Sequence, residues 1–291
     1  MRFAIAAASD RYLGVFESFV NAGWQPVKLF TIGDADKFDE QQGVIACAQK
    51  NGAGVQHSRL VESNFNELGD LGCEVLIVAG YLWRIPPWSA HLKYAVNFHP
   101  SPLPHGRGIY PAVRAILEKW DYWAVTCHKL APTFDSGDIL ATEKFPLAAD
   151  ESHERIDLKI QMAAKRLAAR VAGDFIPLWQ NATRQQGGDY WGKPPLREHV
   201  IDFSKPVEEI LRHIRAYGSN VSLAKLDGKW FGITRAVGWP EAHAFKPGSV
   251  VHIYNRSAVV AAADGYIGLT EIDAAPDTLA QQIEASFRTA T

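Results

Sequence analysis

The stretch AVNFHPSPLPHGRGIYP, Ala95 to Pro111, joins an apolar run to a loop that contains four prolines and two glycines. Proline does not fit inside a central strand, so we expect the strand YAVNF to end near Phe98. Asn97 and His99 are two positions apart on an extended chain, which points both side chains to the same side. Open α/β sheets bind ligands at the carboxyl ends of their strands. The stretch therefore predicts a polar site at a sheet edge.

The residues before this stretch alternate short apolar runs with amphipathic segments. The strand-like runs are RFAIAAA, PVKLFTI and CEVLIVAG, and the helix-like segments are YLGVFESFVNAG and GVIACAQKNG. Such alternation is typical of βαβ units with a parallel sheet that is buried on both faces. We predict an α/β fold with a Rossmann-like, mostly parallel sheet.

The residues after the stretch predict a second, smaller domain. PAVRAILEKW reads as a short helix, YWAVTCHKLAP and GDILATEKFPL as strands, and Ser152 to Trp179 as one long helix capped by Ser152. QNATRQQGGDYWGKPPLREHV lacks periodicity, as linkers do. SKPVEEILRHIRAY then reads as a helix, followed by short strands typical of a β-rich, OB-like domain. We expect a large domain over residues 1–182, a linker over 183–203 and a small domain over 204–291.

Composition excludes several classes of protein. With 291 residues, 47% of them apolar, the chain can bury a large core, and its net charge of −2 creates no general attraction to nucleic acid or membranes. No apolar run approaches the roughly 18 residues of a membrane-spanning helix. Cys47, Cys73 and Cys127 are odd in number and form no CxxC pair. We interpret them as reduced thiols of a cytoplasmic protein.

Common catalytic motifs are missing from the sequence. It contains no GxGxxG after the first strand, no Walker loop and no GxSxG. The histidines match no standard metal-ligand spacing, so we expect no metal site. A polar trio is left: Asn97, His99 and Asp135, the last in the turn TFDSGDIL. The alternative is purely structural, with a hydrogen-bonded histidine and an aspartate that begins a turn before Gly137.

The two segments that carry the trio resemble a known signature. NFHPSPLPHGRGIYP followed by VTCHKLAPTFDSGDIL is similar to the folate-dependent formyltransferases, which include glycinamide ribonucleotide, methionyl-tRNA and amino-sugar formyltransferases. GYLWRIPP resembles the family loop that holds the folate pterin, and DFSKPVEEILRHIRAYG resembles the helix that opens the small domain. Pro102 departs from the pattern, which usually has leucine there. The matching elements are Asn97, His99, Ser101, Leu103, Pro104, Arg107, Gly108, Thr126, His128, Asp135, Gly137, Ile139 and Leu140.

The resemblance implies a formyltransferase catalytic domain over residues 1–182 that takes 10-formyltetrahydrofolate as formyl donor and uses no metal. In such a site Asn97 and His99 donate hydrogen bonds to the formyl oxygen, and Asp135 takes the proton of the amine. The implied supporting residues are Ser101, His128 and Gly137. The implied donor-binding residues are Leu82, Trp83, Arg84, Ile85 and Asp138. Expected contacts of the acceptor are Asp10, Arg11, Arg107 and Gly108, since arginine pairs well with anions.

The sequence leaves three functions open. From Ile201 onward the chain has nine Lys and Arg against ten Asp and Glu, a net charge of −1 that fits tRNA binding poorly. We therefore favour an amine of a small metabolite, such as a nucleotide-linked amino sugar or a siderophore-type hydroxylated amine. The alternatives are methionyl-tRNA and hydrolysis of formyl-folate. Family hydrolases carry an extra amino-terminal domain, whereas we expect the first strand here to begin at Arg2. The oligomeric state is left open.

Overall fold

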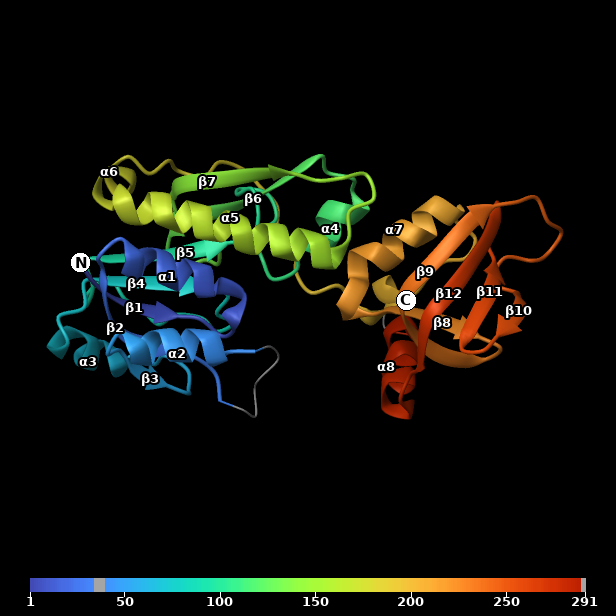
Figure 1. The fold of residues 1–291 in the computed structure, drawn as a ribbon, viewed down its shortest axis with the longest axis horizontal. Helices are drawn as coiled ribbons and strands as arrows, with labels where there is room; N and C mark the ends of the chain where they lie inside the picture. Colours follow the sequence, from blue (N-terminus) through green and yellow to red (C-terminus); the bar gives the residue numbers. More distant parts are fainter. Residues whose placement is uncertain (34–39, 289–291) are drawn as a thin grey trace. The chain divides into compact units, whose positions relative to one another are not determined.

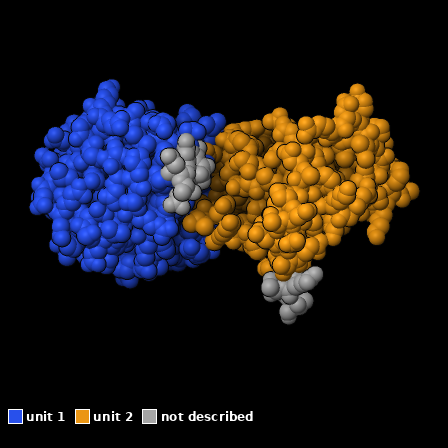
Figure 2. All heavy atoms as spheres, turned by 90° about the horizontal axis from the view of Figure 1, so that it is seen from below, with its two compact units in different colours: residues 1–108, 122–146, 158–191 blue, residues 109–121, 147–157, 192–291 orange. Residues whose placement is uncertain are grey.

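The computed structural model describes residues 1–33 and 40–288. The chain divides into two compact units, coloured separately in Figure 2. Unit 1 comprises residues 1–108, 122–146 and 158–191, and unit 2 comprises residues 109–121, 147–157 and 192–291. Each unit has a β-sheet of its own.

Unit 1 is built on a seven-stranded sheet in the order β3-β2-β1-β4-β5-β6-β7 (Figure 1). The first five strands in this order are parallel, and β6 and β7 join antiparallel at one edge. The Rossmann-like, mostly parallel sheet is thus confirmed. The strands are β1 (Arg2–Ala6), β2 (Gln25–Phe30), β3 (Gly54–Gln56), β4 (Val75–Ala79), β5 (Tyr94–His99), β6 (Tyr122–Lys129) and β7 (Ile139–Pro146).

Helices bury both faces of this sheet. On one face the Phe3 ring packs edge-on against Phe16 of α1, and on the other Ala4 belongs to a cluster with Phe65 and Leu68 of α3. A strand buried on both sides must be apolar along its buried length, as β4 is throughout and β1 is after the exposed Arg2. The helices up to residue 180 are α1 (Leu13–Asn21), α2 (Gln42–Lys50), α3 (Asn64–Asp70), α4 (Pro111–Leu117), α5 (His153–Gly173) and α6 (Phe175–Gln180).

The single helix expected from Ser152 to Trp179 is interrupted. Ser152 does cap α5, because its Oγ accepts a hydrogen bond from the backbone N–H of Arg155 at 3.3 Å. The helix ends at Gly173, and Asp174 leaves the helical region with φ −119° and ψ 29°. Pro177 explains the break, since a proline has no N–H to donate and is tolerated only in a first helical turn. None of the helices in the described ranges is long and apolar enough to cross a bilayer.

Unit 2 contains a five-stranded antiparallel sheet in the order β10-β11-β12-β9-β8. The expected β-rich region is therefore present. Ile210 and Ile214 of α7 belong to one buried cluster with Ile233 and Ile267 of the sheet. The elements are α7 (Val207–Tyr217), β8 (Ser222–Leu226), β9 (Lys229–Pro240), β10 (Val250–Tyr254), β11 (Ser257–Ala261), β12 (Gly265–Ala274) and α8 (Asp277–Arg288).

Candidate active site

Three polar side chains meet where β5 ends. Asn97 and His99 lie on β5, and Asp135 lies in the loop between β6 and β7. Asn97 Nδ2 donates to Asp135 Oδ1 at 3.3 Å, and His99 Nδ1 lies 3.4 Å from the same oxygen. The structure thus brings together side chains that are 38 positions apart in the sequence.

The neighbouring histidine sets the orientation of the Asn97 amide. His128 faces Asn97 across the β5–β6 ladder, and its Nδ1 lies 2.8 Å from the Lys129 carbonyl oxygen. A carbonyl only accepts, so Nδ1 of His128 carries a proton, and in the neutral imidazole Nε2 accepts from Asn97 Nδ2 at 3.2 Å. In the charged imidazole Nε2 faces Asp135 Oδ1 at 3.7 Å. With His128 neutral, both amide hydrogens of Asn97 are in use. Asn97 must exchange one of these hydrogen bonds before it can donate to a substrate.

His99 lies between two acceptors. Its Nε2 is 2.8 Å from the Gly106 carbonyl oxygen, and its Nδ1 faces the Asp135 carboxylate. Only 5% of the residue is exposed. Burial lowers the pKa of His99, and this outweighs the Asp135 carboxylate and the Gly106 carbonyl, which raise it. Before substrate binds, burial therefore favours the neutral form of the His99 imidazole.

Asp135 is a buried carboxylate. Its Oδ2 accepts the backbone N–H of Gly108 at 2.9 Å, and its side chain is 10% exposed. Burial alone would raise the pKa of Asp135, but His99, His128 and the Gly108 N–H together lower it to about 2. Asp135 is therefore ionised at neutral pH. The His99–Asp135 pair can then take up a further proton.

Buried and partly buried hydrogen bonds hold the proline-rich loop in place. The hydroxyl of Ser101 donates to the His105 carbonyl at 2.8 Å, and the hydroxyl of Thr126 donates to the Ser101 carbonyl at 2.7 Å. Trp123 Nε1 donates to the Pro100 carbonyl at 2.8 Å. A loop held from inside in this way presents the Gly106 carbonyl and the Gly108 N–H at defined positions.

Gly137 is required by the close approach of two backbone segments. A Cβ at this position would overlap the carbonyl oxygen of Lys129. Next to it, the Asp138 carbonyl accepts from the Lys129 N–H at 2.9 Å, and the Asp138 carboxylate lies 3.5 Å from the Lys129 ammonium. Gly137 thus supports the Asp135 loop, while donor binding by Asp138 stays a prediction.

The loop expected to hold the pterin is more open. Leu82 is 57% exposed, whereas Trp83 is half-buried and Ile85 packs against the core. Arg84 Nη2 donates to the Pro132 carbonyl at 2.6 Å, which ties this loop to the loop of Asp135. The role of these four residues in donor binding stays a prediction.

Asp10 has a structural contact that the sequence did not reveal. Its two carboxylate oxygens accept the backbone N–H groups of Gly43 and Val44, both at 2.8 Å, in the first turn of α2. A carboxylate at a helix N-terminus stabilises that helix. Arg11 is exposed on the short helix that precedes α1. Contacts of Asp10 and Arg11 with an acceptor stay predictions.

A segment that sequence reasoning assigned to the linker contacts the site. We call residues 183–191 the strap. Within the strap, Trp191 N–H donates to the Arg107 carbonyl at 2.6 Å, and Gln185 Oε1 accepts from Arg107 Nε at 3.1 Å and Nη2 at 2.8 Å. Gly108 has φ +104°, and a Cβ there would lie 2.5 Å from the Trp191 carbonyl oxygen. The binding of an acceptor by Arg107 and Gly108 stays a prediction, as do the linker boundaries.

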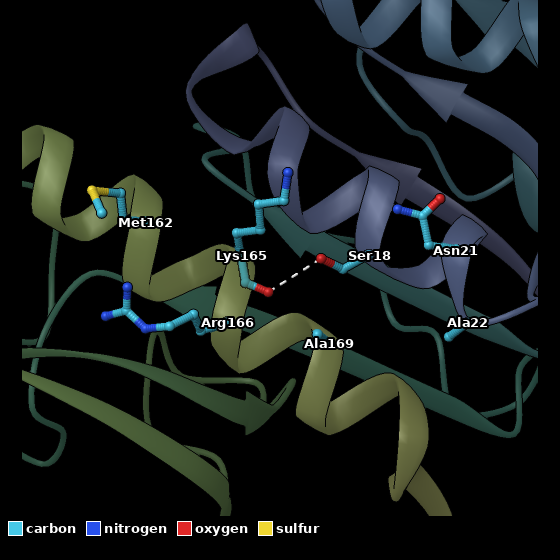
Figure 3. Close-up of a pocket in the computed structure, with 7 residues that line it drawn as sticks. All are labelled: Ser18, Asn21, Ala22, Met162, Lys165, Arg166 and Ala169. Carbon is cyan, nitrogen blue, oxygen red and sulfur yellow. Dashed lines mark hydrogen bonds between the residues drawn. The ribbon is translucent and has the colours of Figure 1, made fainter.

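A groove elsewhere in unit 1 takes no part in this arrangement. It has a volume of about 620 Å³ and lies between α1 and α5 (Figure 3). The Ser18 hydroxyl donates to the Lys165 carbonyl at 3.1 Å and joins the two helices there. None of the trio lines it. The lining residues are Ser18, Asn21, Ala22, Met162, Lys165, Arg166 and Ala169.

Within residues 1–33 and 40–288, no three His, Cys, Asp or Glu side chains gather so as to hold a metal ion. Cys47, Cys73 and Cys127 are free thiols. Burial raises the pKa of Cys73 to about 11, so this thiol is protonated at neutral pH.

Comparison with known families identifies the family of the chain. Residues 29–172 match the model of the formyl transferases, and residues 196–283 match that of the formyl transferase C-terminal domain. The chain belongs to the formyl transferase family. The resemblance drawn from the sequence is thereby confirmed, and so is the enzyme class at the level of the family.

Two relatives of this formyl transferase in sequence bear the same name. The methionyl-tRNA formyltransferase of Variovorax paradoxus (strain S110) is 28% identical over 206 residues, which cover 68% of this chain and 64% of that protein. The methionyl-tRNA formyltransferase of Halorhodospira halophila is 26% identical over 287 residues, which cover 93% of this chain and 91% of that protein. The chain thus spans just under two thirds of the first relative and most of the second.

A solved structure shares the fold. It is the N-formyltransferase from Helicobacter canadensis, determined in complex with folinic acid and dTDP-3-aminofucose. The two chains superpose with a TM-score of 0.67 at 15% identity, over 93% of this chain and 99% of that one. At this identity the likeness establishes the fold.

Proposed function

We propose that this formyl transferase moves a formyl group from 10-formyltetrahydrofolate to an amine of a small metabolite. The observation that carries the proposal is the meeting of Asn97, His99 and Asp135 within 3.4 Å at the end of β5. A carboxamide, an imidazole and a carboxylate are the groups that formyl transfer requires, for the following reasons.

The reaction creates two opposite charges. The amine nitrogen attacks the formyl carbon, so a C–N bond forms while negative charge develops on the formyl oxygen and positive charge on the amine. The bond from the formyl carbon to the folate nitrogen then breaks, and that nitrogen takes up a proton. The site must therefore stabilise an oxyanion and move one proton from the amine to the folate.

Asp135 is suited to accept the proton of the amine. It is ionised, because its pKa is lowered to about 2. Once the amine has become cationic by attack, it gives its proton to the carboxylate, directly or through one water. His99 Nδ1, 3.4 Å from Asp135 Oδ1, can share that proton until the folate nitrogen takes it.

Asn97 and His99 are suited to hold the formyl oxygen. In the structure both amide hydrogens of Asn97 are donated, to Asp135 and to His128. The arriving formyl oxygen replaces one of these acceptors, and His99 can donate beside it once its Nδ1 shares the proton of the amine. Each such donor typically lowers the barrier by about 3 kcal/mol. If Asn97→Ala kept normal turnover, the assignment of Asn97 would be wrong.

The donor site is suited to a flat ring. Leu82 is 57% exposed and Phe134 is 52% exposed, and the Arg84–Pro132 hydrogen bond joins the two loops that carry them. Two apolar side chains held at a polar site offer a surface for the pterin ring of the folate. This arrangement supports the roles proposed for residues 82–85.

Charge favours a small acceptor over tRNA. Residues 201–291 have a net charge of −1, whereas a surface that grips tRNA needs an excess of lysine and arginine. The Helicobacter canadensis neighbour was solved with a nucleotide-linked amino sugar. Methionyl-tRNA stays the second candidate, because the Halorhodospira halophila relative that bears this name covers 93% of the chain.

An acceptor screen tests the proposal. The purified protein is incubated with 10-formyltetrahydrofolate and, separately, with nucleotide-linked amino sugars, hydroxylated amines, methionyl-tRNA or no acceptor. We expect one of the small amines to gain the mass of one formyl group. Formylation of methionyl-tRNA alone would show that the acceptor is the tRNA and not a small amine. Release of formate without any amine would show that the protein is a hydrolase and not a transferase.

A further inference from the structure

Gln185 of the strap joins the two loops that form the site. Its Nε2 donates to the carbonyl of Asp135 at 2.8 Å and to the carbonyl of Gly137 at 2.7 Å. Its Oε1 accepts from Arg107 Nε and Nη2 at 3.1 and 2.8 Å. The single amide therefore uses both hydrogens on one loop and its oxygen on the other.

We propose that Gln185 is a positioning residue for Asp135. It holds the backbone of residues 135–137 so that the Asp135 carboxylate stays against His99 and Asn97. The inference rests on the proposed function, because it assigns Gln185 to the same proton transfer. Gln185 itself acts through Asp135 and not on the substrate.

The backbone of Asp135 needs such support. Asp135 has φ +54°, in the left-handed region that costs a residue with a side chain about 1 kcal/mol. The Gly108 N–H holds its carboxylate from one side, and the Gln185 amide holds its carbonyl from the other. Two hydrogen bonds on opposite ends of the residue define where the carboxylate points.

The strap is itself anchored on both sides of Gln185. Thr183 and Ile139 exchange two backbone hydrogen bonds of 2.8 and 2.9 Å at the start of β7. Further along, Asp189 Oδ1 accepts the Gly106 N–H at 3.1 Å, and Trp191 stacks on Trp123 with ring centroids 5.9 Å apart. Gln185 therefore lies between two anchored segments of the strap. These anchors limit the movement of its amide and, through it, of the Asp135 backbone.

One substitution of Gln185 can break its contact with the Asp135 loop and keep its contact with Arg107. Such a substitution distinguishes positioning of Asp135 from general stabilisation of the fold. Glutamate in place of Gln185 puts an oxygen against the carbonyls of Asp135 and Gly137, which repels them. The same substitution preserves an acceptor for Arg107 and adds an ion pair. Gln185→Glu thus breaks the contact with the Asp135 loop and keeps the contact with Arg107.

The kinetic test compares Gln185→Glu and Gln185→Met with Gln186→Glu and Gln186→Met, since Gln186 is the adjacent, exposed glutamine. We expect kcat of both Gln185 variants to fall about 10-fold to 100-fold, as misplacement of a reacting group does. The KM for the formyl donor should change less than the kcat does. A kcat of the Gln185 variants equal to that of the Gln186 variants would overturn the proposal, whatever the thermal unfolding temperature.

A second readout does not depend on activity. The titration of His99 is followed by histidine NMR in the wild type and in Gln185→Met, which is uncharged, with His99→Asn to assign the signal. Asp135 raises the pKa of His99, so a displaced carboxylate should lower it further. An unchanged titration in folded Gln185→Met would overturn the proposal. If the wild type transferred no formyl group, the proposed function would fail while this titration would still test Gln185.

Discussion

The two loops at the candidate site differ in how firmly they are held. In the loop of Asp135 the carboxylate is buried, and contacts reach it from β5, from the proline-rich loop and from the strap. In the loop of residues 82–85, Leu82 is 57% exposed, and one hydrogen bond of Arg84 reaches the neighbouring loop. The groups that we propose for proton transfer are therefore arranged before substrate binds, whereas the groups that we propose for donor binding are open to it.

The largest effect should come from the firmly held loop. Asp135→Asn keeps the size of the side chain but removes the proton acceptor, so we expect kcat to fall about 1000-fold. Steady-state formyl transfer at saturating donor measures it. Asp150→Asn is the control, because the Asp150 side chain is 73% exposed and pairs with Arg155. A kcat of Asp135→Asn within tenfold of the wild type would mean that Asp135 is not the proton acceptor.

The next effect concerns the stability of the same loop. Gly137→Ala forces a Cβ into the Lys129 carbonyl, and overpacking of this kind costs about 3 kcal/mol of unfolding free energy. Gly69→Ala is the matched control, because Gly69 lies in α3 with no atom within 4 Å of the added Cβ. There we expect a gain of about 0.5 to 1 kcal/mol, from the higher helix propensity of alanine. Urea unfolding measures both, and equal changes would contradict the close approach at Gly137.

The pH dependence of stability tests the burial of Asp135. Its pKa is lowered from the ordinary 3.8 to about 2 by folding. A carboxyl group of this kind stabilises the folded state above pH 3.8 and loses that contribution as the pH falls through 2. We expect the wild type to lose about 2 kcal/mol more than Asp135→Asn between pH 5 and pH 2. Parallel losses in urea unfolding of the two proteins would show that the pKa is not lowered.

The smallest effect should come from the open loop. Leu82→Ala removes an exposed side chain, so its unfolding free energy should change by less than about 0.5 kcal/mol. The KM for formyl-folate should rise about threefold to tenfold, because apolar contact with the ring is lost. Val61→Ala is the control, with a side chain 50% exposed elsewhere in unit 1. A KM of Leu82→Ala equal to that of the control would remove Leu82 from the donor site.

Much of the fold was predictable from the pattern of apolar residues. The runs that became β1, β2, β4 and β5 are short and mostly apolar, as strands buried on both faces must be. Shorter elements gave no such signal. β3 has three residues and α3 has seven, too few for a period to show, and α8 follows a series of strands in a segment read as wholly β.

The candidate site was predictable only where local spacing carries it. The period of two along β5 placed Asn97 and His99 on one side, and the prolines marked the end of that strand. Nothing local shows that the Asp10 carboxylate caps α2 or that His128 orients Asn97. Gln185 was missed altogether, because it lies in a segment without periodicity.

The sequence by itself determined the class of the sheet, the place where β5 ends and the membership of the formyl transferase family, since these depend on residues that are neighbours in the chain. Only the tertiary structure decided which acceptor forms a hydrogen bond with each polar N–H or O–H group. The hydrogen bonds of Asn97, Asp135 and Gln185 join segments dozens of residues apart. Their distances depend on how the strands and loops pack, and no local pattern encodes that packing.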